Sequence, residues 1–136
     1  NNTDTSEFKE SLEIIVDGKE TNNVFSIVEQ RLRKGKISDR HKHTLEEHSV
    51  DVLSGSILLS VEDEIVEVST GDFFYIPPFV WHEFKILEDN TRIRITNYPA
   101  GFEQFFKEIQ SQPKSEHDSI SEKYGILTSQ SPLLKE

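Results

Sequence analysis

The stretch that decides the fold is "GKISDRHKHTLEEHSVDVLSG", residues 35–55, which carries three of the five histidines of the chain. His41 and His43 are separated by one residue in what reads as β-structure, and His48 opens the strand-like run "HSVDVLSG". Because successive side chains of a strand point to opposite faces, His41 and His43 point the same way. This geometry suits two ligands of one metal ion, and a short loop over 44–47 would bring His48 back to them.

A second stretch, "GDFFYIPPFVWH" at residues 71–82, ends on a fourth histidine, His82, after a turn made by two prolines. Imidazole is a common ligand of zinc, copper, iron and nickel. Four imidazoles would fill a tetrahedral site or leave two positions open in an octahedral one. A histidine on a strand is also a common surface or core residue, so spacing alone leaves both interpretations open.

Short β-type segments separated by turn signals run through most of the chain. About eight such segments with glycine and proline between them indicate an all-β sandwich or barrel. The strand–helix alternation of a nucleotide-binding α/β fold is missing from the sequence. We expect strands in "SLEIIV" (11–16), "NVFSIVEQRLR" (23–33), "HSVDVLSG" (48–55), "SILLSVE" (56–62), "EIVEVSTG" (64–71), "DFFYIPP" (72–78), "WHEFKIL" (81–87) and "TRIRITNY" (91–98).

The pattern changes at Ala100. In "GFEQFFKEI", residues 101–109, four apolar side chains recur at helical spacing and form one stripe: Phe102, Phe105, Phe106 and Ile109. This stripe predicts a C-terminal amphipathic helix laid against the barrel or a partner subunit. A short helix is expected near 117–123, followed by an irregular tail. Residues 1–10 are polar and without pattern, so we expect a disordered terminus before a single domain over 11–136, with the barrel at about 12–98 and the helix and tail at about 101–136.

The bulk composition limits the partners. The chain of 136 residues has a net charge of −10, which argues against a nucleic-acid or anionic-membrane surface. It has no cysteine, so thiolate metal sites and disulfides are excluded. No apolar run reaches the ~18 residues of a membrane span and no secretory segment is present. We expect a cytoplasmic protein, with a removed targeting segment as the alternative because the chain begins at Asn1 and contains no methionine.

The two histidine stretches together resemble the two motifs of the cupin superfamily. The positions that carry the resemblance are Gly35, His41, His43, His48 and Gly55 in the first motif and Gly71, Pro77 and His82 in the second. The flanks "DGKETNNVFSIVEQRLRKGK" and "NYPAGFEQFFKEI", and "EKYGI" with a later Ser-Pro, are similar to small quercetin 2,3-dioxygenase-like cupins. The resemblance spans most of 12–133. It implies a single jelly-roll β-barrel that holds one divalent transition metal ion (Fe, Mn, Ni, Cu or Zn) through His41, His43, His48 and His82.

The chain departs from this family at the third ligand of the first motif, which is usually a glutamate. Counting back from Gly55 places His48 there, whereas Glu47 would take the position if the loop were one residue shorter. Four neutral imidazoles leave the full charge of a divalent ion, which favours anionic or enolate-like oxygen ligands. The exchange also removes a carboxylate thought to accept the substrate proton in quercetinase-type cupins. A neighbouring carboxylate, Glu47 or Glu83, or a metal-bound hydroxide would then be the general base.

A second departure is Phe79, where the family usually has a glycine that permits positive φ. We expect a rearranged turn with Phe79 at the barrel mouth. Phe84 shares the face of His82 and is predicted to line the substrate pocket, whereas Trp81 is expected to pack in the core. A pocket walled by phenylalanine and valine suits an apolar or aromatic small molecule.

Three functions compete on this basis. The first is a metal-dependent dioxygenase-like enzyme acting on a small organic substrate. The second is a zinc-dependent Lewis-acid cyclase, isomerase or lyase, as in the polyketide-cyclase branch of cupins. The third is a non-catalytic barrel that binds a small ligand or an adventitious ion. A homodimer, paired through 11–16 or through the helix at 101–110, follows from family analogy.

Overall fold

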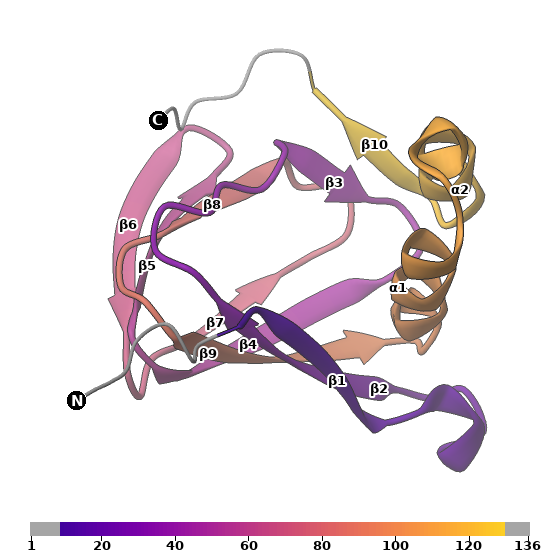
Figure 1. Cartoon of the computed structure of the whole chain (residues 1–136), viewed down its shortest axis with the longest axis horizontal. Helices are drawn as coiled ribbons and strands as arrows, with labels where there is room; N and C mark the ends of the chain where they lie inside the picture. Colours follow the sequence, from indigo (N-terminus) through magenta and orange to yellow (C-terminus); the bar gives the residue numbers. More distant parts are fainter. Residues whose placement is uncertain (1–8, 130–136) are drawn as a thin grey trace.

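A computed structural model describes residues 9–129, so most of the predicted disordered terminus and the tail residues Leu133 and Leu134 lie outside the described residues. The chain forms two antiparallel five-stranded sheets that face each other, in the orders β1-β2-β9-β4-β7 and β10-β3-β8-β5-β6 (Figure 1). This is the jelly-roll barrel that the sequence predicts. The strands are β1 Ser11–Val16, β2 Ser26–Leu32, β3 His41–His43, β4 Glu47–Ser54, β5 Ser56–Val61, β6 Glu64–Ser69, β7 Phe73–Ile76, β8 His82–Ile86, β9 Thr91–Tyr98 and β10 Ile126–Thr128.

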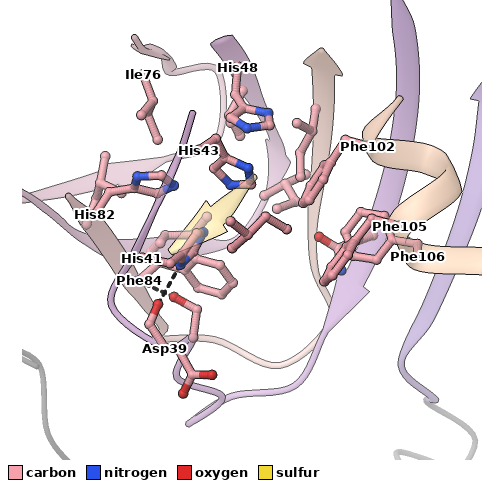
Figure 2. A pocket seen from close by; sticks show the side chains of 18 of the residues that line it. Asp39, His41, His43, His48, Ile76, His82, Phe84, Phe102, Phe105 and Phe106 are labelled. Atoms are coloured by element: carbon pink, nitrogen blue, oxygen red, sulfur yellow. Dashed lines mark hydrogen bonds between the residues drawn. The ribbon is translucent and has the colours of Figure 1, made fainter. Parts of the chain in front are cut away.

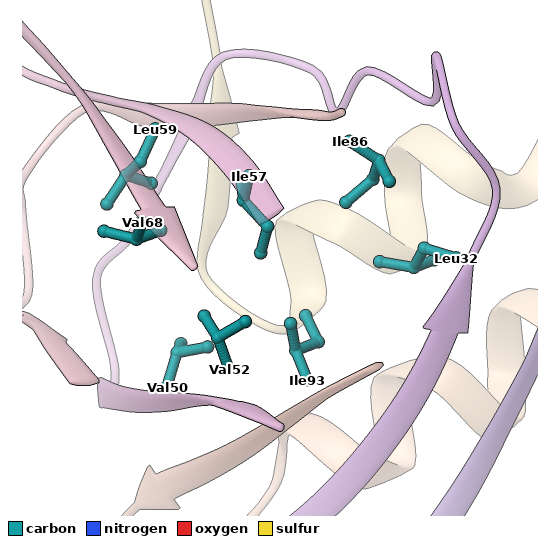
Figure 3. Packing of buried hydrophobic residues seen from close by; sticks show 8 residues of the cluster. All are labelled: Leu32, Val50, Val52, Ile57, Leu59, Val68, Ile86 and Ile93. Atoms are coloured by element: carbon teal, nitrogen blue, oxygen red, sulfur yellow. The ribbon is translucent and has the colours of Figure 1, made fainter. Parts of the chain in front are cut away.

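The space between the sheets is filled by aliphatic side chains that alternate with outward-facing residues. On β4, Val50 and Val52 are buried while Asp51 between them is exposed, and Val52 lies opposite Ile93 of β9. Each aliphatic side chain removed from water contributes about 1.5–3 kcal/mol. Figure 3 shows the core cluster: Leu32, Val50, Val52, Ile57, Leu59, Val68, Ile86 and Ile93. Four of its members, Val50, Ile57, Leu59 and Ile93, also line the cavity that holds the histidines, so the core and the site share a wall.

The turn between β4 and β5 depends on Gly55. Its φ of +97° lies in the left-handed region, and a Cβ there would come within 2.3 Å of the Thr91 hydroxyl. Only glycine fits both the backbone conformation and this approach.

The C-terminal segment lies along one side of the barrel (Figure 1). It contains α1 Phe102–Ser111, the 3₁₀ turn Lys114–Glu116 and α2 His117–Lys123; a further 3₁₀ turn, Gly18–Glu20, follows β1. Both predicted helices are confirmed. The expectation of a wholly irregular tail was wrong, because residues 126–128 form β10 and pair with β3. No helix within 9–129 is long and apolar enough to cross a membrane.

The proline turn before β8 keeps the conformation that the family glycine would adopt. Phe79 has a φ of 66°, and its N–H donates to the backbone carbonyl of His43 over 2.8 Å. The expected rearrangement of this turn is therefore wrong. Phe79 is 61% exposed and is not among the residues that line the cavity at the histidines, so it is not part of the predicted substrate pocket.

Candidate metal centre

Strands of both sheets bring four histidines to the inside of the barrel, β3 and β8 from one sheet and β4 from the other. His41 and His43 lie on β3, His48 on β4 and His82 on β8, and His41 is directly opposite His82 in the sheet register. The ring centroids of His41 and His82 are 4.3 Å apart and those of His43 and His48 are 4.0 Å apart. Figure 2 shows the four rings gathered in one region, facing the aromatic side chains of α1.

Two overlapping groups of candidate ligands share His43. The ligand atoms of His41, His43 and His82 lie within 4.8 Å of one another, and so do those of His43, Glu46 and His48. The four predicted ligands therefore lie together, and a carboxylate that the sequence interpretation did not include joins them.

Each histidine uses its Nδ1 to contact an oxygen of the protein. The Nδ1 of His41 is 2.6 Å from the carbonyl oxygen of Asp39, and that of His82 is 2.9 Å from the carbonyl oxygen of Val80. The other two contacts are His43 Nδ1 to Glu46 Oε1 at 3.1 Å and His48 Nδ1 to Asn97 Oδ1 at 2.6 Å. A backbone or amide oxygen accepts, so the ring donates from Nδ1 and keeps the Nε2 lone pair for a metal.

The Nε2 of His48 tests whether these residues fit a metal ion. It is buried and has no hydrogen-bond partner among the described residues; the nearby Glu46 Oε1 is 3.9 Å away. A buried nitrogen left without a partner is costly, whereas a coordinated ion would satisfy it. The donor set fits a transition metal.

Burial also keeps the histidines in the neutral form that coordinates metals. Desolvation, together with the neighbouring histidines, lowers the pKa of His43 to about 3 and the pKa of His82 to about 2. Desolvation likewise lowers the pKa of His41, and lowers the pKa of His48 well below its ordinary value. No proton therefore has to leave these rings at neutral pH before a metal binds.

Glu46 is the residue that sequence reasoning missed. Burial, with the nearby Glu103 carboxylate, raises the pKa of Glu46 to about 7. Its place in the loop just before β4 gave no periodic signal, because a three-residue loop can turn its side chains in any direction. The signal available was an acidic residue three positions after His43.

Glu47 and Glu83 lie on the opposite faces of their strands from His48 and His82, as strand alternation requires. Glu47 interacts with the Tyr75 hydroxyl, and Glu83 is fully buried with its Oε1 3.5 Å from Arg40 Nη1. Neither residue lines the pocket. The structure thus brings together the four histidines but not the two carboxylates predicted as bases. Of Glu47 and His48, it is His48 whose side chain faces inward.

A cavity of about 270 Å³ opens onto the histidines. Its wall is largely apolar and includes Phe84, as predicted, and three residues of the α1 stripe, Phe102, Phe105 and Phe106 (Figure 2). Phe102 touches the centre itself: its ring is 4.8 Å from that of His43 and 5.1 Å from that of His48. The residues of the C-terminal segment that line the cavity are Phe102, Phe105, Phe106, Ser121, Ile126 and Thr128.

A two-sheet antiparallel barrel with a histidine cluster inside defines a class of small double-stranded β-helix proteins. The family model described as "Cupin domain" matches residues 28–97, and the chain belongs to this family. The match covers the strands that carry all four histidines.

Solved structures agree on the fold. KdgF from Halomonas sp. has a TM-score of 0.63 at 18% identity, with 74% of this chain and 94% of that chain covered. A predicted oxalate decarboxylase from Thermotoga maritima has a TM-score of 0.61 at 13% identity, covering 73% and 99%. A putative sugar phosphate isomerase from Acidithiobacillus ferrooxidans has a TM-score of 0.54 at 25% identity, covering 65% of this chain and 58% of that one. A search of curated proteins finds no match.

Proposed function

We propose that this cupin is a metal-dependent, dioxygenase-like enzyme that acts on a small, largely apolar organic molecule with an acidic enol or phenol oxygen. The observation that supports it is a set of four neutral histidines whose Nδ1 atoms are occupied by protein oxygens, at the end of an apolar cavity. A bound Fe, Mn, Ni or Cu ion would supply a Lewis-acidic centre with open positions for substrate and dioxygen.

The side chains divide the remaining tasks. His41, His43, His48 and His82 hold the ion, and Glu46 holds the ring of His43. Phe84 and the phenylalanines of α1 exclude water and bind the apolar body of the substrate. The predicted bases Glu47 and Glu83 do not line the cavity, so the substrate that suits this site best is one whose oxygen is already ionised when it binds.

The test is metal content combined with dioxygen uptake. A dioxygenase places both oxygen atoms of O₂ in the product and oxidises the substrate by four electrons, so no further reductant is needed. We expect protein purified without an affinity tag to carry one redox-capable ion and to consume one O₂ per molecule of a flavonol or a β-diketone. His82→Ala removes the ion and the uptake, whereas His117→Ala, in α2 outside the cluster, preserves both. A chain that binds no ion refutes the proposal.

Zinc-dependent Lewis-acid chemistry is the second candidate, because all four ligands are nitrogen atoms and zinc accepts such a set. Protein that carries zinc and consumes no dioxygen with either the flavonol or the β-diketone would favour this second candidate. A phosphorylated sugar is a poor candidate substrate, since no lysine or arginine is among the described residues that line the cavity. If the metal-loaded protein binds the flavonol or the β-diketone without converting it, a non-catalytic cupin would be favoured.

The homodimer stays a prediction. The phenylalanines of α1 line the cavity, so they are not free to contact a second copy. Of the two elements predicted to pair, this leaves β1, which lies at the edge of its sheet. Sedimentation of the wild type against a variant with Ile14→Lys in β1 tests this pairing.

A further inference from the structure

We infer that a row of buried hydrogen bonds from His48 through Asn97 and Ser26 to Glu103 positions His48 as a metal ligand and fixes which ring nitrogen carries its proton. The inference rests on the proposed metal site for its purpose, but the row itself is a property of the metal-free protein.

The row crosses three neighbouring strands. Asn97 of β9 is directly opposite Ser26 of β2 on one side and His48 of β4 on the other. Asn97 Oδ1 lies 2.6 Å from His48 Nδ1, and Asn97 Nδ2 lies 3.1 Å from Ser26 Oγ. The Ser26 hydroxyl in turn bonds to the Glu103 carboxylate in the first turn of α1. All four side chains are at least nine-tenths buried, so water does not compete for these bonds.

Glu103 sets the direction of every bond in the row. Its Oε2 accepts from the Gly18 N–H over 2.9 Å and its Oε1 from the Gly101 N–H over 2.8 Å. Burial alone would raise the pKa of Glu103, but the hydrogen bonds that it accepts from Ser26 and the backbone lower that pKa below its ordinary value. A carboxylate only accepts, so Ser26 must point its hydrogen at Glu103 and present its lone pairs to Asn97.

The amide of Asn97 then has one orientation that satisfies both neighbours. Its NH₂ group faces Ser26 and its oxygen faces His48, which therefore donates from Nδ1. The Nε2 of His48 is left with a lone pair, in agreement with its lack of a partner in the described structure. With the amide reversed, an N–H would face Nδ1, the proton would move to Nε2, and His48 could not coordinate a metal through Nε2.

The same row connects the metal centre to the wall of the cavity. Glu103 follows Phe102, whose ring packs against the rings of His43 and His48. Asn97, Ser26 and Glu103 are thus positioning residues, because they act on the site through His48 and do not line the cavity. Outer partners of this kind are typically worth about 10–100-fold in metal affinity.

The experiment is ¹⁵N NMR of histidine-labelled, metal-free protein, with His48 assigned from the signals lost in His48→Gln. We expect wild-type His48 to be neutral and protonated at Nδ1. Ser26→Ala frees the Asn97 amide and shifts His48 toward the Nε2–H form, and Asn97→Leu does the same, whereas Asn97→Asp keeps the acceptor and preserves the Nδ1–H form. Ser56→Ala is the matched control, since Ser56 is also a buried serine and bonds to Glu88 outside the cavity.

Titration with zinc chloride by calorimetry supplies the second readout. Ser26→Ala should weaken zinc binding about 10-fold or more, and Ser56→Ala should leave it unchanged. Wild-type His48 protonated at Nε2, or a Ser26→Ala variant with unchanged tautomer and zinc affinity, overturns the inference. A wild type that binds no metal refutes the proposed function instead, while the tautomer measurements still decide the role of the row.

Discussion

The buried ion pair between Arg40 and Glu83 offers the sharpest test of how the centre is held together. The Arg40 and Glu83 side chains are 9% and 0% exposed and 3.5 Å apart. Arg40 also donates to the carbonyl of Glu62 over 3.0 Å and to the Ser60 hydroxyl over 3.4 Å. The pair joins the residue just before β3 to β8, and these two strands share one register pair, His41 with His82. It therefore connects the two strands that carry His41, His43 and His82 where few backbone hydrogen bonds join them.

Glu83→Gln removes the charge of one partner and leaves Arg40 buried without it. Breaking a buried pair in this way costs about 3–5 kcal/mol, because the remaining charge stays buried without an opposite charge to compensate for its lost hydration. In a chain of 136 residues we expect a fall in melting temperature on the order of 10 °C. Urea unfolding followed by circular dichroism measures the free energy directly.

Two further variants test whether the loss of stability in Glu83→Gln comes from the broken ion pair. Arg40→Met combined with Glu83→Leu replaces both charges by apolar groups and should recover most of the loss. Glu29→Gln, which weakens the more exposed pairs of Glu29 with Arg92 and Arg94, should cost about 1 kcal/mol or less. A Glu83→Gln protein that unfolds like the wild type but turns over substrate slowly would contradict this reasoning and restore Glu83 as a base.

Three other substitutions have definite outcomes. Gly55→Ala should destabilise the fold by about 1–3 kcal/mol, measured by urea unfolding, because the added methyl group meets Thr91 and φ is positive. Phe79→Gly should raise the melting temperature, since it relieves about 1 kcal/mol of left-handed strain at an exposed ring. The hydrogen bond from Arg94, followed by that from Arg92, holds the pKa of Glu29 below its ordinary value of 4.5. Its stabilising contribution is therefore complete above that value and is lost as the pH falls through the lower pKa of the folded state. Unfolding free energies at neutral and acidic pH should differ less in Glu29→Gln than in the wild type.

The strands and helices with a periodic signal could be predicted from sequence. Alternation in "TRIRITNY" located β9 at the residues where it is found, and the apolar stripe located α1. β10 could not be predicted in this way, because three residues carry no readable period and the strand exists through its pairing with β3.

In the candidate site, too, the residues with a local sequence pattern could be predicted and those without one could not. Alternation from His41 to His43, and the spacing from His48 to Gly55, correctly placed these histidines on inward faces. The carboxylates Glu47 and Glu83 do not line the cavity, although they were predicted as its bases. Their roles depend on partners from other strands and loops, such as Arg40 for Glu83, and no local pattern encodes those partners. The row through Asn97 was missed for the same reason, since its members come from strands and a helix far apart in sequence.

The pairing of β10 with β3 has a consequence for the order in which the site is completed during synthesis. β3 shares three register pairs with β10 but one with β8, and the hydroxyl of Thr44 at its end donates to the carbonyl of Gly125, 81 positions later. Until β10 has been made and has left the ribosome, β3 therefore lacks the strand with which it shares most of its register pairs. Such distant contacts form late because loop closure must come first. In a nascent chain the proposed metal centre should thus be completed only after β10 has paired with β3, as one of the last steps of folding.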